Sequence, residues 1–316
     1  MPANWLFWVL FHVFVFAAMA LDLGVLHRNT HEVRFREAAI TTAIWVALAG
    51  VFALLLYHHG HVMAADQKHS NATLSLEFVT GYLVEESLSI DNLFVFLLIF
   101  KFFQVPRELH HHVLFWGIVG ALVARAVFIF AGVALLSRFH WVVYIFGAFL
   151  IYAGFGLMRS TQKVDPGKNP VLRFMEKHVR VTTDYESGKR FFVYRDGVRY
   201  ATRLLLVLIV VETTDIIFAI DSIPAVLAVT RNPFIVYTSN VFAILGLRSL
   251  YFALEGSMQR FHFLHYGLAV VLIFVGGKML TSEWFEMPIA IALGVIAIVL
   301  AGSVALSLVF PKQQEI

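Results

Sequence analysis

The sequence predicts an all-α protein, a polytopic membrane helix bundle of about nine transmembrane helices that contains two inverted three-helix repeats. Three observations predict this fold class. The 316 residues are 59% hydrophobic and only 14% charged, and their mean hydropathy is +0.78, as expected for one membrane domain. Long apolar runs alternate with short polar links. Polar residues recur in matching positions in two parts of the chain.

The apolar runs define the expected helices, because a helix needs about 20 residues to cross the hydrocarbon core. They cover residues 5–26, 38–57, 76–100, 113–136, 141–158, 204–229, 234–254, 263–281 and 287–310. No Lys or Arg precedes the first run, so we interpret it as a retained helix rather than a cleaved signal peptide. The chain is expected to form one transmembrane domain over 1–316, divided at 75–158 (first repeat), 159–203 (basic cytoplasmic loop), 204–281 (second repeat) and 282–316 (last helix and tail).

The internal repeat rests on three matched segments. Asp91 corresponds to Asp221, Arg125 to Arg248, and the run from Tyr144 to the run from Tyr266, at shifts of about 130, 123 and 122 residues. Each unit has an odd number of spans, so the two copies should have opposite orientations. Inverted three-helix repeats with polar motifs near the midplane are typical of transporters.

The positive-inside rule predicts the orientation. Nearly all Lys and Arg of the links fall after the first, third, fifth and seventh spans and in the tail, which places the N-terminus outside and the C-terminus in the cytoplasm. We interpret the basic 159–203 loop as this bias together with contact to anionic lipid, with a partner site as the alternative. Within the loop, 171–179 is predicted to be a short amphipathic helix, and Asp196-Gly197 a hairpin turn.

Two acidic motifs lie inside apolar runs: Glu85-Glu-Ser-Leu-Ser-Ile-Asp91-Asn92 and Glu212-Thr-Thr-Asp215-(x)5-Asp221-Ser222-Ile-Pro. A carboxylate at membrane depth costs about 2.5 to 3.5 kcal/mol, so the five acids that we select together cost on the order of 12 to 17 kcal/mol if nothing compensates them. We expect a bound cation, alternating with protons, to do so. Glu86 points elsewhere on a helix and is interpreted as flanking.

Helix geometry qualifies this site. Asp215 and Asp221 point about 120° apart on an unbroken helix, so they converge best if the helix is interrupted. We expect Pro224 to cause that break, because it removes a backbone bond and clashes with the carbonyl of Ile220. Arg125 and Arg248 lie inside spans and are expected to form ion pairs or to cap helix ends.

The predicted ligands are Glu85, Asp91, Glu212, Asp215 and Asp221, with Asn92 and Ser222 as accessory donors. All are hard oxygen donors, which suit Mn²⁺, Ca²⁺ or Mg²⁺ rather than zinc or copper. The chain has no cysteine, which excludes disulfides and thiolate metal sites. Two histidine groups, His58–His61 and His110–His112, are expected in loops, as interfacial residues or, alternatively, as metal collectors.

Enzyme classes are disfavoured. The chain has no His-Glu-x-x-His motif, no Gly-x-Gly-Asp motif and no phosphate-binding loop, so we expect neither a membrane protease nor a nucleotide-dependent enzyme. The formal net charge of +3 is too small to suggest nucleic acid as a partner. No resident cofactor is expected.

The two acidic motifs, together with Thr238-Ser-Asn240-Val-Phe-Ala-Ile-Leu-Gly-Leu-Arg248, resemble the TerC/Alx family of bacterial membrane proteins. The resemblance extends from Phe35-Arg-Glu-Ala to the last span. Members of this family are implicated in manganese export and in metal supply to exported enzymes. The resemblance implies that Glu85, Asp91, Glu212, Asp215 and Asp221 are the acidic site, with Asn240 as a further accessory residue.

The sequence and the resemblance together indicate a divalent metal exporter of the bacterial inner membrane. Its cargo is expected to be Mn²⁺, driven by protons because crowded carboxylates cannot all stay ionised without a cation. The alternative is a non-transporting scaffold that helps exported or stress proteins to acquire metal. Expected partners are the metal ion and membrane lipid, with a second copy or other membrane proteins left open.

The topology can be tested directly. A reporter fused after Lys189 should report the cytoplasm and one fused after Lys68 the outside, because the arginine-rich links mark the inner face. Paired phosphatase and fluorescent-protein fusions measure this in cells. The opposite pattern would reverse the orientation and leave the inverted repeat untouched.

Overall fold

The computed structural model describes residues 4–21, 35–159, 167, 169–182, 185, 188–195, 197–255, 263–282, 284–285 and 287–310. Within these residues, nine long helices follow one another with a short helix and a β-hairpin between the fifth and the next. The long helices are α1 (Asn4–Leu21), α2 (Phe35–Met63), α3 (Asn71–Phe103), α4 (Arg107–Arg138), α5 (Val142–Arg159), α7 (Arg203–Leu227), α8 (Pro233–Glu255), α9 (Leu264–Leu280) and α10 (Ile289–Val309). The short elements are α6 (Pro170–His178), β1 (Phe192–Arg195) and β2 (Val198–Ala201).

Local sequence signals explain where the helices begin. Ser70 precedes α3 and its hydroxyl accepts a hydrogen bond from the amide of Thr73, and Thr202 does the same for Leu205 at the start of α7. Such N-caps satisfy amides that have no partner in the first helical turn. Asn169 caps α6 in the same way, and Pro170 follows at the first helical position, where its missing amide costs nothing.

The predicted segments are confirmed as helices, and the loop elements are confirmed as well. Helix α6 matches the segment predicted at 171–179, and β1 pairs with β2 in antiparallel register. Gly197 takes a φ of 75°, as the predicted turn requires, while Asp196 lies outside the described residues. Much of 159–187 and the tail 311–316, to which other expectations apply, also lie outside them.

Five helices are long and apolar enough to cross a membrane by length and composition: α2, α4, α5, α8 and α10. Two further apolar helices, at Trp5–Ala20 and Leu264–Leu280, are shorter, and α3 and α7 carry the acidic motifs. The structure therefore confirms a multi-pass all-α membrane bundle. The count of nine spans stays a prediction.

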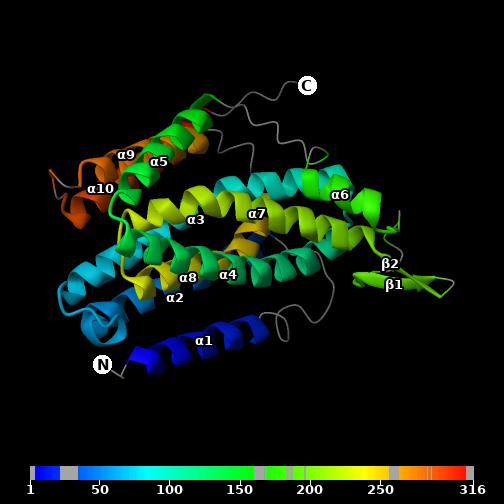
Figure 1. The fold of residues 1–316 in the computed structure, drawn as a ribbon, viewed down its shortest axis with the longest axis horizontal. Coiled ribbons are helices and arrows are strands. Elements are labelled where there is room, and N and C mark those ends of the chain that lie inside the picture. The colour runs from blue at the N-terminus through cyan, green and yellow to red at the C-terminus, as the bar shows by residue number, and fades with distance from the viewer. Residues whose placement is uncertain are drawn as a thin grey trace.

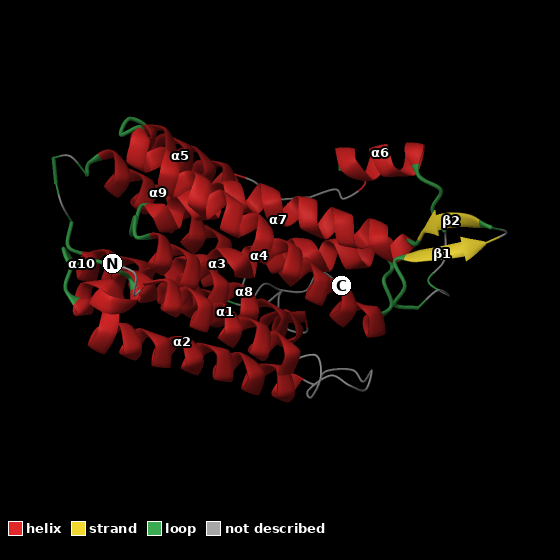
Figure 2. Ribbon diagram, turned by 60° about the horizontal axis from the view of Figure 1, so that its bottom comes forward, coloured by secondary structure: helices red, strands yellow, loops and turns green. Residues whose placement is uncertain are grey.

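The helices form an elongated bundle around two buried helices, α3 and α8, which pack on each other (Figure 1). Helix α2 packs on both, α7 packs on α4 and α3, and α5, α9 and α10 form a group on one side. Helix α6 and the hairpin lie at the end of the long axis opposite to the start of α1 (Figure 2). The outward faces of α2 and α10 are apolar, as lipid contact requires.

Helix α7 is continuous, so the predicted break at Pro224 is wrong. The helix runs through Pro224 to Leu227, and the carbonyl of Pro224 accepts a hydrogen bond from the amide of Ala228. The proline lies within the last turn, where few backbone bonds depend on it, and membrane helices tolerate such a position. The irregular backbone lies elsewhere, at His59 in α2, with φ −128° and ψ 15°.

Glycines bring α5 and α9 into backbone contact. A Cβ atom on Gly154 would lie 2.8 Å from the carbonyl oxygen of Ala269, and one on Gly276 would lie 2.7 Å from that of Gly147. Such distances leave no space for a methyl group. Small residues at helix interfaces allow this close approach, which stabilises helix pairs within membranes.

Adjacent glycines of α9 offer a matched test of this contact. Alanine normally stabilises a helix by up to about 1 kcal/mol relative to glycine. Gly276→Ala should instead be destabilising: we expect it to lower the free energy of unfolding by about 1 to 3 kcal/mol, because the added methyl group overpacks the contact. Gly277→Ala is the control, since no atom lies within 4 Å of its added Cβ. Melting temperatures of the purified proteins measure both, and equal values would contradict the contact.

Candidate ion-binding site

The centre of the candidate site is Arg125 of α4, whose side chain is 1% exposed. Its Nη1 atom forms an ion pair with Oε1 of Glu85 in α3, and its Nη2 atom lies 3.3 Å from Oδ1 of Asp215 in α7. The guanidinium therefore joins two helices that the chain separates by about 100 residues. A buried ion pair persists only when its geometry and added hydrogen bonds offset the cost of desolvation.

Two predicted accessory residues complete the surroundings of the guanidinium. Nη1 of Arg125 donates to Oδ1 of Asn240 in α8 at 3.3 Å and to Oγ of Ser222 in α7 at 3.5 Å. Asn240 and Ser222 are fully buried. Each of the two carboxylates that contact Arg125 keeps one buried oxygen without a hydrogen-bond partner, Oε2 of Glu85 and Oδ2 of Asp215. The expectation that Arg125 forms an ion pair is thus confirmed.

The other predicted ligands lie around this centre. Asp221 interacts electrostatically with both Arg125 and Asp91, and Glu212 interacts with Asp215. The carboxylate of Glu212 lies against Gly120 of α4, where any Cβ atom would clash with it. Asp91, Glu212 and Asp221 form no ion pair with any residue that the structure describes. Asn92 is buried, and its Nδ2 atom has no hydrogen-bond partner.

Within the described parts of the chain, no three acidic or histidine side chains gather closely enough to hold a metal ion together. Two features of the fold account for this. Helix α7 is unbroken, so Asp215 and Asp221 diverge by about 120°. The guanidinium of Arg125 also stands between Glu85 and Asp215. Glu86 faces away from this group, toward Gly246 of α8, as expected for a flanking residue.

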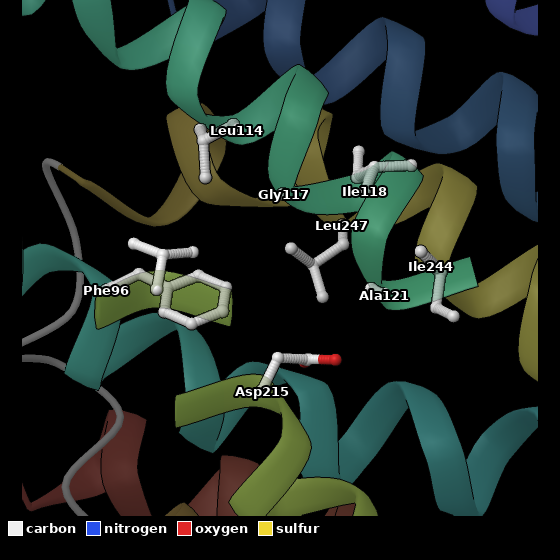
Figure 3. A pocket seen from close by; sticks show the side chains of 9 residues that line it. Phe96, Leu114, Gly117, Ile118, Ala121, Asp215, Ile244 and Leu247 are labelled. Atoms are coloured by element: carbon white, nitrogen blue, oxygen red, sulfur yellow. The ribbon is translucent and has the colours of Figure 1, made fainter. Parts of the chain in front are cut away.

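A small apolar cavity lies beside Asp215, whose side chain points into it (Figure 3). Its volume is about 10 Å³, the least that can hold one water molecule. The lining includes Phe96, Leu114, Val211 and Leu247, all nearer than Asp215 to the end of the bundle that carries the hairpin. Apolar side chains thus lie between Asp215 and that end.

A much larger cavity, of about 1330 Å³, opens at the opposite end, beside the links that follow α2, α4, α7 and α9. It contains an acidic side chain outside the predicted ligand set. Glu77 of α3 is 7% exposed, accepts a 2.6 Å hydrogen bond from Thr230, and interacts with Lys278. The sequence contains a signal that could have identified Glu77, because this acid lies near the start of an apolar run.

The predicted loop position of both histidine groups is wrong. His58, His59 and His61 belong to the end of α2, and His110 to His112 lie in the first turns of α4. His110 is buried, stacks on Phe100 at 4.4 Å, and hydrogen-bonds Tyr251 at 3.0 Å. The aromatic and backbone partners of His110 are those of a packing residue.

Asp66 and His69 form an ion pair in the link between α2 and α3, at the mouth of the large cavity. Burial alone would raise the pKa of Asp66, but hydrogen bonds from the His69 ring and from the amides of Lys68 and His69 outweigh it, and the pKa lies below its usual value. The hydrogen bond to Asp66 raises the pKa of His69, against a smaller opposing effect of burial. Opposite charges favour both ionised forms.

The pair makes stability depend on pH. The raised pKa of His69 stabilises the fold fully below about pH 6.5, its usual pKa, and this contribution disappears as pH rises through the folded value. His69→Gln should therefore lower the free energy of unfolding near pH 5.5 by no more than about 1 kcal/mol, because the ring is half-exposed. The loss should be much smaller near pH 9, and melting temperatures at the two pH values measure it. His178→Gln, whose ring contacts a carbonyl of its own helix, is the control. A pH-independent difference would contradict the pairing.

Fold and site together define a class: a multi-pass integral membrane protein with a buried acidic cluster. Residues 70–315 match the "Integral membrane protein TerC family", and the chain belongs to this family. No solved structure matches the chain.

Curated relatives match over almost the whole chain. A membrane protein of Myxococcus xanthus, described as uncharacterized, is 46% identical over 303 residues, covering 96% of this chain and 92% of its own. Alx of Escherichia coli K12, whose name proposes a membrane-bound redox modulator, is 44% identical over 298 residues, which cover 92% of this chain and 90% of its own. An uncharacterized membrane protein of Rickettsia bellii is 38% identical over 289 residues, with 91% and 92% covered. These names give no catalytic activity.

Proposed function

We propose that this protein exports a divalent cation, Mn²⁺ by preference, from the bacterial cytoplasm across the inner membrane. The observation that carries the proposal is the meeting of Glu85 and Asp215 at Arg125 inside the bundle. Asp221 interacts electrostatically with Arg125 and with Asp91, and Glu212 interacts with Asp215. One arginine cannot balance five carboxylates, so the cluster retains capacity for a cation. Oxygen donors of this kind suit Mn²⁺, Ca²⁺ or Mg²⁺.

The acids meet in pairs that the sequence repeat relates. Glu85 and Asp215, which correspond in the two motifs, share Arg125, and the corresponding Asp91 and Asp221 interact with each other. An inverted repeat brings equivalent positions together at its axis, so these pairs support an axis through the site.

The packing of α5 on α9 supports the same repeat. Gly154 contacts Ala269 and Gly276 contacts Gly147, and the shift of 122 residues that aligns Tyr144 with Tyr266 exchanges these two contacts. Likewise α3 packs on α8 as α7 packs on α4. Reciprocal contacts of this kind are expected from two similar units related by a two-fold axis.

The two ends of the bundle differ as expected for one state of an alternating-access transporter. The end with the basic link is the cytoplasmic one by the positive-inside rule, and apolar side chains close it beside Asp215. The opposite end has a polar cavity that reaches Glu77. One turn further along α3, Gly81 packs on Val226 and Ser239, which separates this cavity from the acids.

Protons are the proposed counter-ion. Asp91, Glu212 and Asp221 have no ion-pair partner among the described residues, and buried like charges favour protonation when no cation is bound. Release of the metal outside would let the cluster take up protons, which it gives up in the cytoplasm when metal binds.

The redox role that appears in the names of the Alx relatives cannot rest on thiol chemistry in this protein. This chain has no cysteine, so it has no thiol with which to exchange disulfides. A metal exporter can affect redox balance through the supply of metal to other proteins. The alternative role as a scaffold for metal loading predicts no ion flux by the purified protein.

Asp91→Asn and Asp221→Asn test the exporter. Each removes one charge from a site whose affinity depends on the charge of its ligands, and should lower the initial Mn²⁺ flux into proteoliposomes by at least about tenfold. Glu108→Gln, an exposed acid in the first turn of α4, is the control. Flux of both variants at the wild-type rate would exclude the shared site, and no flux by the wild type would favour the scaffold.

The same vesicles test coupling. Mn²⁺ flux should be faster when the proton gradient is directed opposite to metal movement than when it is reversed, with counterflow of protons. Equal rates under both gradients would indicate a channel or uniporter.

A further inference from the structure

One feature of the site is that Arg125 already occupies the ligands that the metal would use. Its guanidinium contacts Glu85, Asp215, Ser222 and Asn240, two predicted metal ligands and two accessory donors. No other described basic side chain forms an ion pair with these acids. The guanidinium and a divalent ion cannot share these oxygens closely, because their charges repel strongly in a medium of low dielectric constant.

We propose that Arg125 acts as a tethered competing cation: it neutralises Glu85 and Asp215 when no metal is bound, and the arriving metal ion displaces its guanidinium from these carboxylates. This inference deepens the proposed export function and rests on it. It assigns to Arg125 a positioning and affinity-setting role in the transport cycle.

Three of the four contacts of Arg125, all except the ion pair with Glu85, are suited to an exchange. Its distances to Asp215, Asn240 and Ser222 are 3.3 to 3.5 Å, longer than the 2.7 to 2.9 Å, approximately, of tight charge-assisted hydrogen bonds. Oε2 of Glu85 and Oδ2 of Asp215 have no hydrogen-bond partner, so each carboxylate has an oxygen through which a metal could first bind. The neutral acceptors Asn240 and Ser222 can keep one end of the guanidinium while the carboxylates are released.

Competition of this kind weakens metal binding and thereby speeds release. If the carboxylates are free of Arg125 for about one tenth of the time, the apparent dissociation constant rises about tenfold. An exporter benefits, since an ion held too tightly cannot leave on the far side. A purely structural arginine would have the opposite signature, because its loss would loosen the site and weaken metal binding.

The experiment compares Arg125→Gln with wild type in the full-length protein, reconstituted in nanodiscs, by calorimetric titration with Mn²⁺. Arg125→Gln should bind Mn²⁺ about tenfold more tightly and export it more slowly in proteoliposomes. Arg248→Gln is the matched control, since Arg248 is equally buried in α8 and hydrogen-bonds His111. Its affinity should stay near that of wild type. Unchanged or weaker binding by folded Arg125→Gln would overturn the inference.

A second variant and a small-molecule probe cover loss of folding. Arg125→Lys keeps a charge but loses the forked contact to both carboxylates, so its Mn²⁺ affinity should lie between those of wild type and Arg125→Gln. If Arg125→Gln does not fold, the test rests on Arg125→Lys: a Mn²⁺ affinity no higher than that of wild type would overturn the inference. In Arg125→Gln, added guanidinium ion should compete with Mn²⁺, and in wild type it should not.

The outcomes also separate the two proposals. If the wild-type protein exports Mn²⁺ but Arg125→Gln binds Mn²⁺ no more tightly than wild type, only the role proposed for Arg125 is excluded. Absence of Mn²⁺ binding and flux in wild type removes the exporter and this inference together.

Discussion

The structure depends on one ion-pair group, the guanidinium of Arg125 with the carboxylates of Glu85 and Asp215. Each of these charges alone would be costly at membrane depth. Together they leave a single excess negative charge, and Ser222 and Asn240 satisfy further donors of the guanidinium. The group joins α3, α4, α7 and α8, so the positions of these four helices are linked to the charge state of the cluster. Any ion that enters must change this balance, which is why binding and helix movement are expected to be coupled.

Close glycine packing holds the second helix group. Gly154 and Gly276 let the backbones of α5 and α9 approach until carbonyl groups of one helix touch the other. In lipid there is little hydrophobic driving force between helices, and such van der Waals contact is the main source of affinity. Helices α3 and α7, by contrast, are joined through the charged side chain of Arg125 as well as by apolar packing. The bundle therefore contains one helix pair held by close backbone contact, α5 with α9, and one pair linked by an ion-pair group, α3 with α7.

The two ends of the bundle are unlike. Packed apolar side chains fill the space between Asp215 and the end with the basic link, whereas the other end has a large cavity with Asp66, His69, Glu77 and Lys278 along it. Apolar packing excludes hydrated ions because a desolvated charge has no partner there. A polar cavity keeps ions hydrated. This asymmetry is what a transporter needs in any single conformation, and it is absent from the sequence pattern, in which both motifs look alike.

The helices, the hairpin and most of the acids inside apolar runs could be predicted from the sequence, whereas Glu77 was missed. Within a membrane every backbone group must be bonded internally, so a long apolar run is a helix whatever its neighbours are, and Asp196-Gly197 specifies a turn locally. Acids such as Asp91 and Asp221 are conspicuous in apolar runs because their cost is local too. Which of these groups meet depends on the packing of the helices. That Arg125 rather than Arg248 reaches Glu85 and Asp215, that α7 continues through Pro224, that His110 packs on Tyr251, and that Glu77 lies on a cavity all depend on how helices distant in sequence are rotated and placed against one another, and no local pattern encodes that placement.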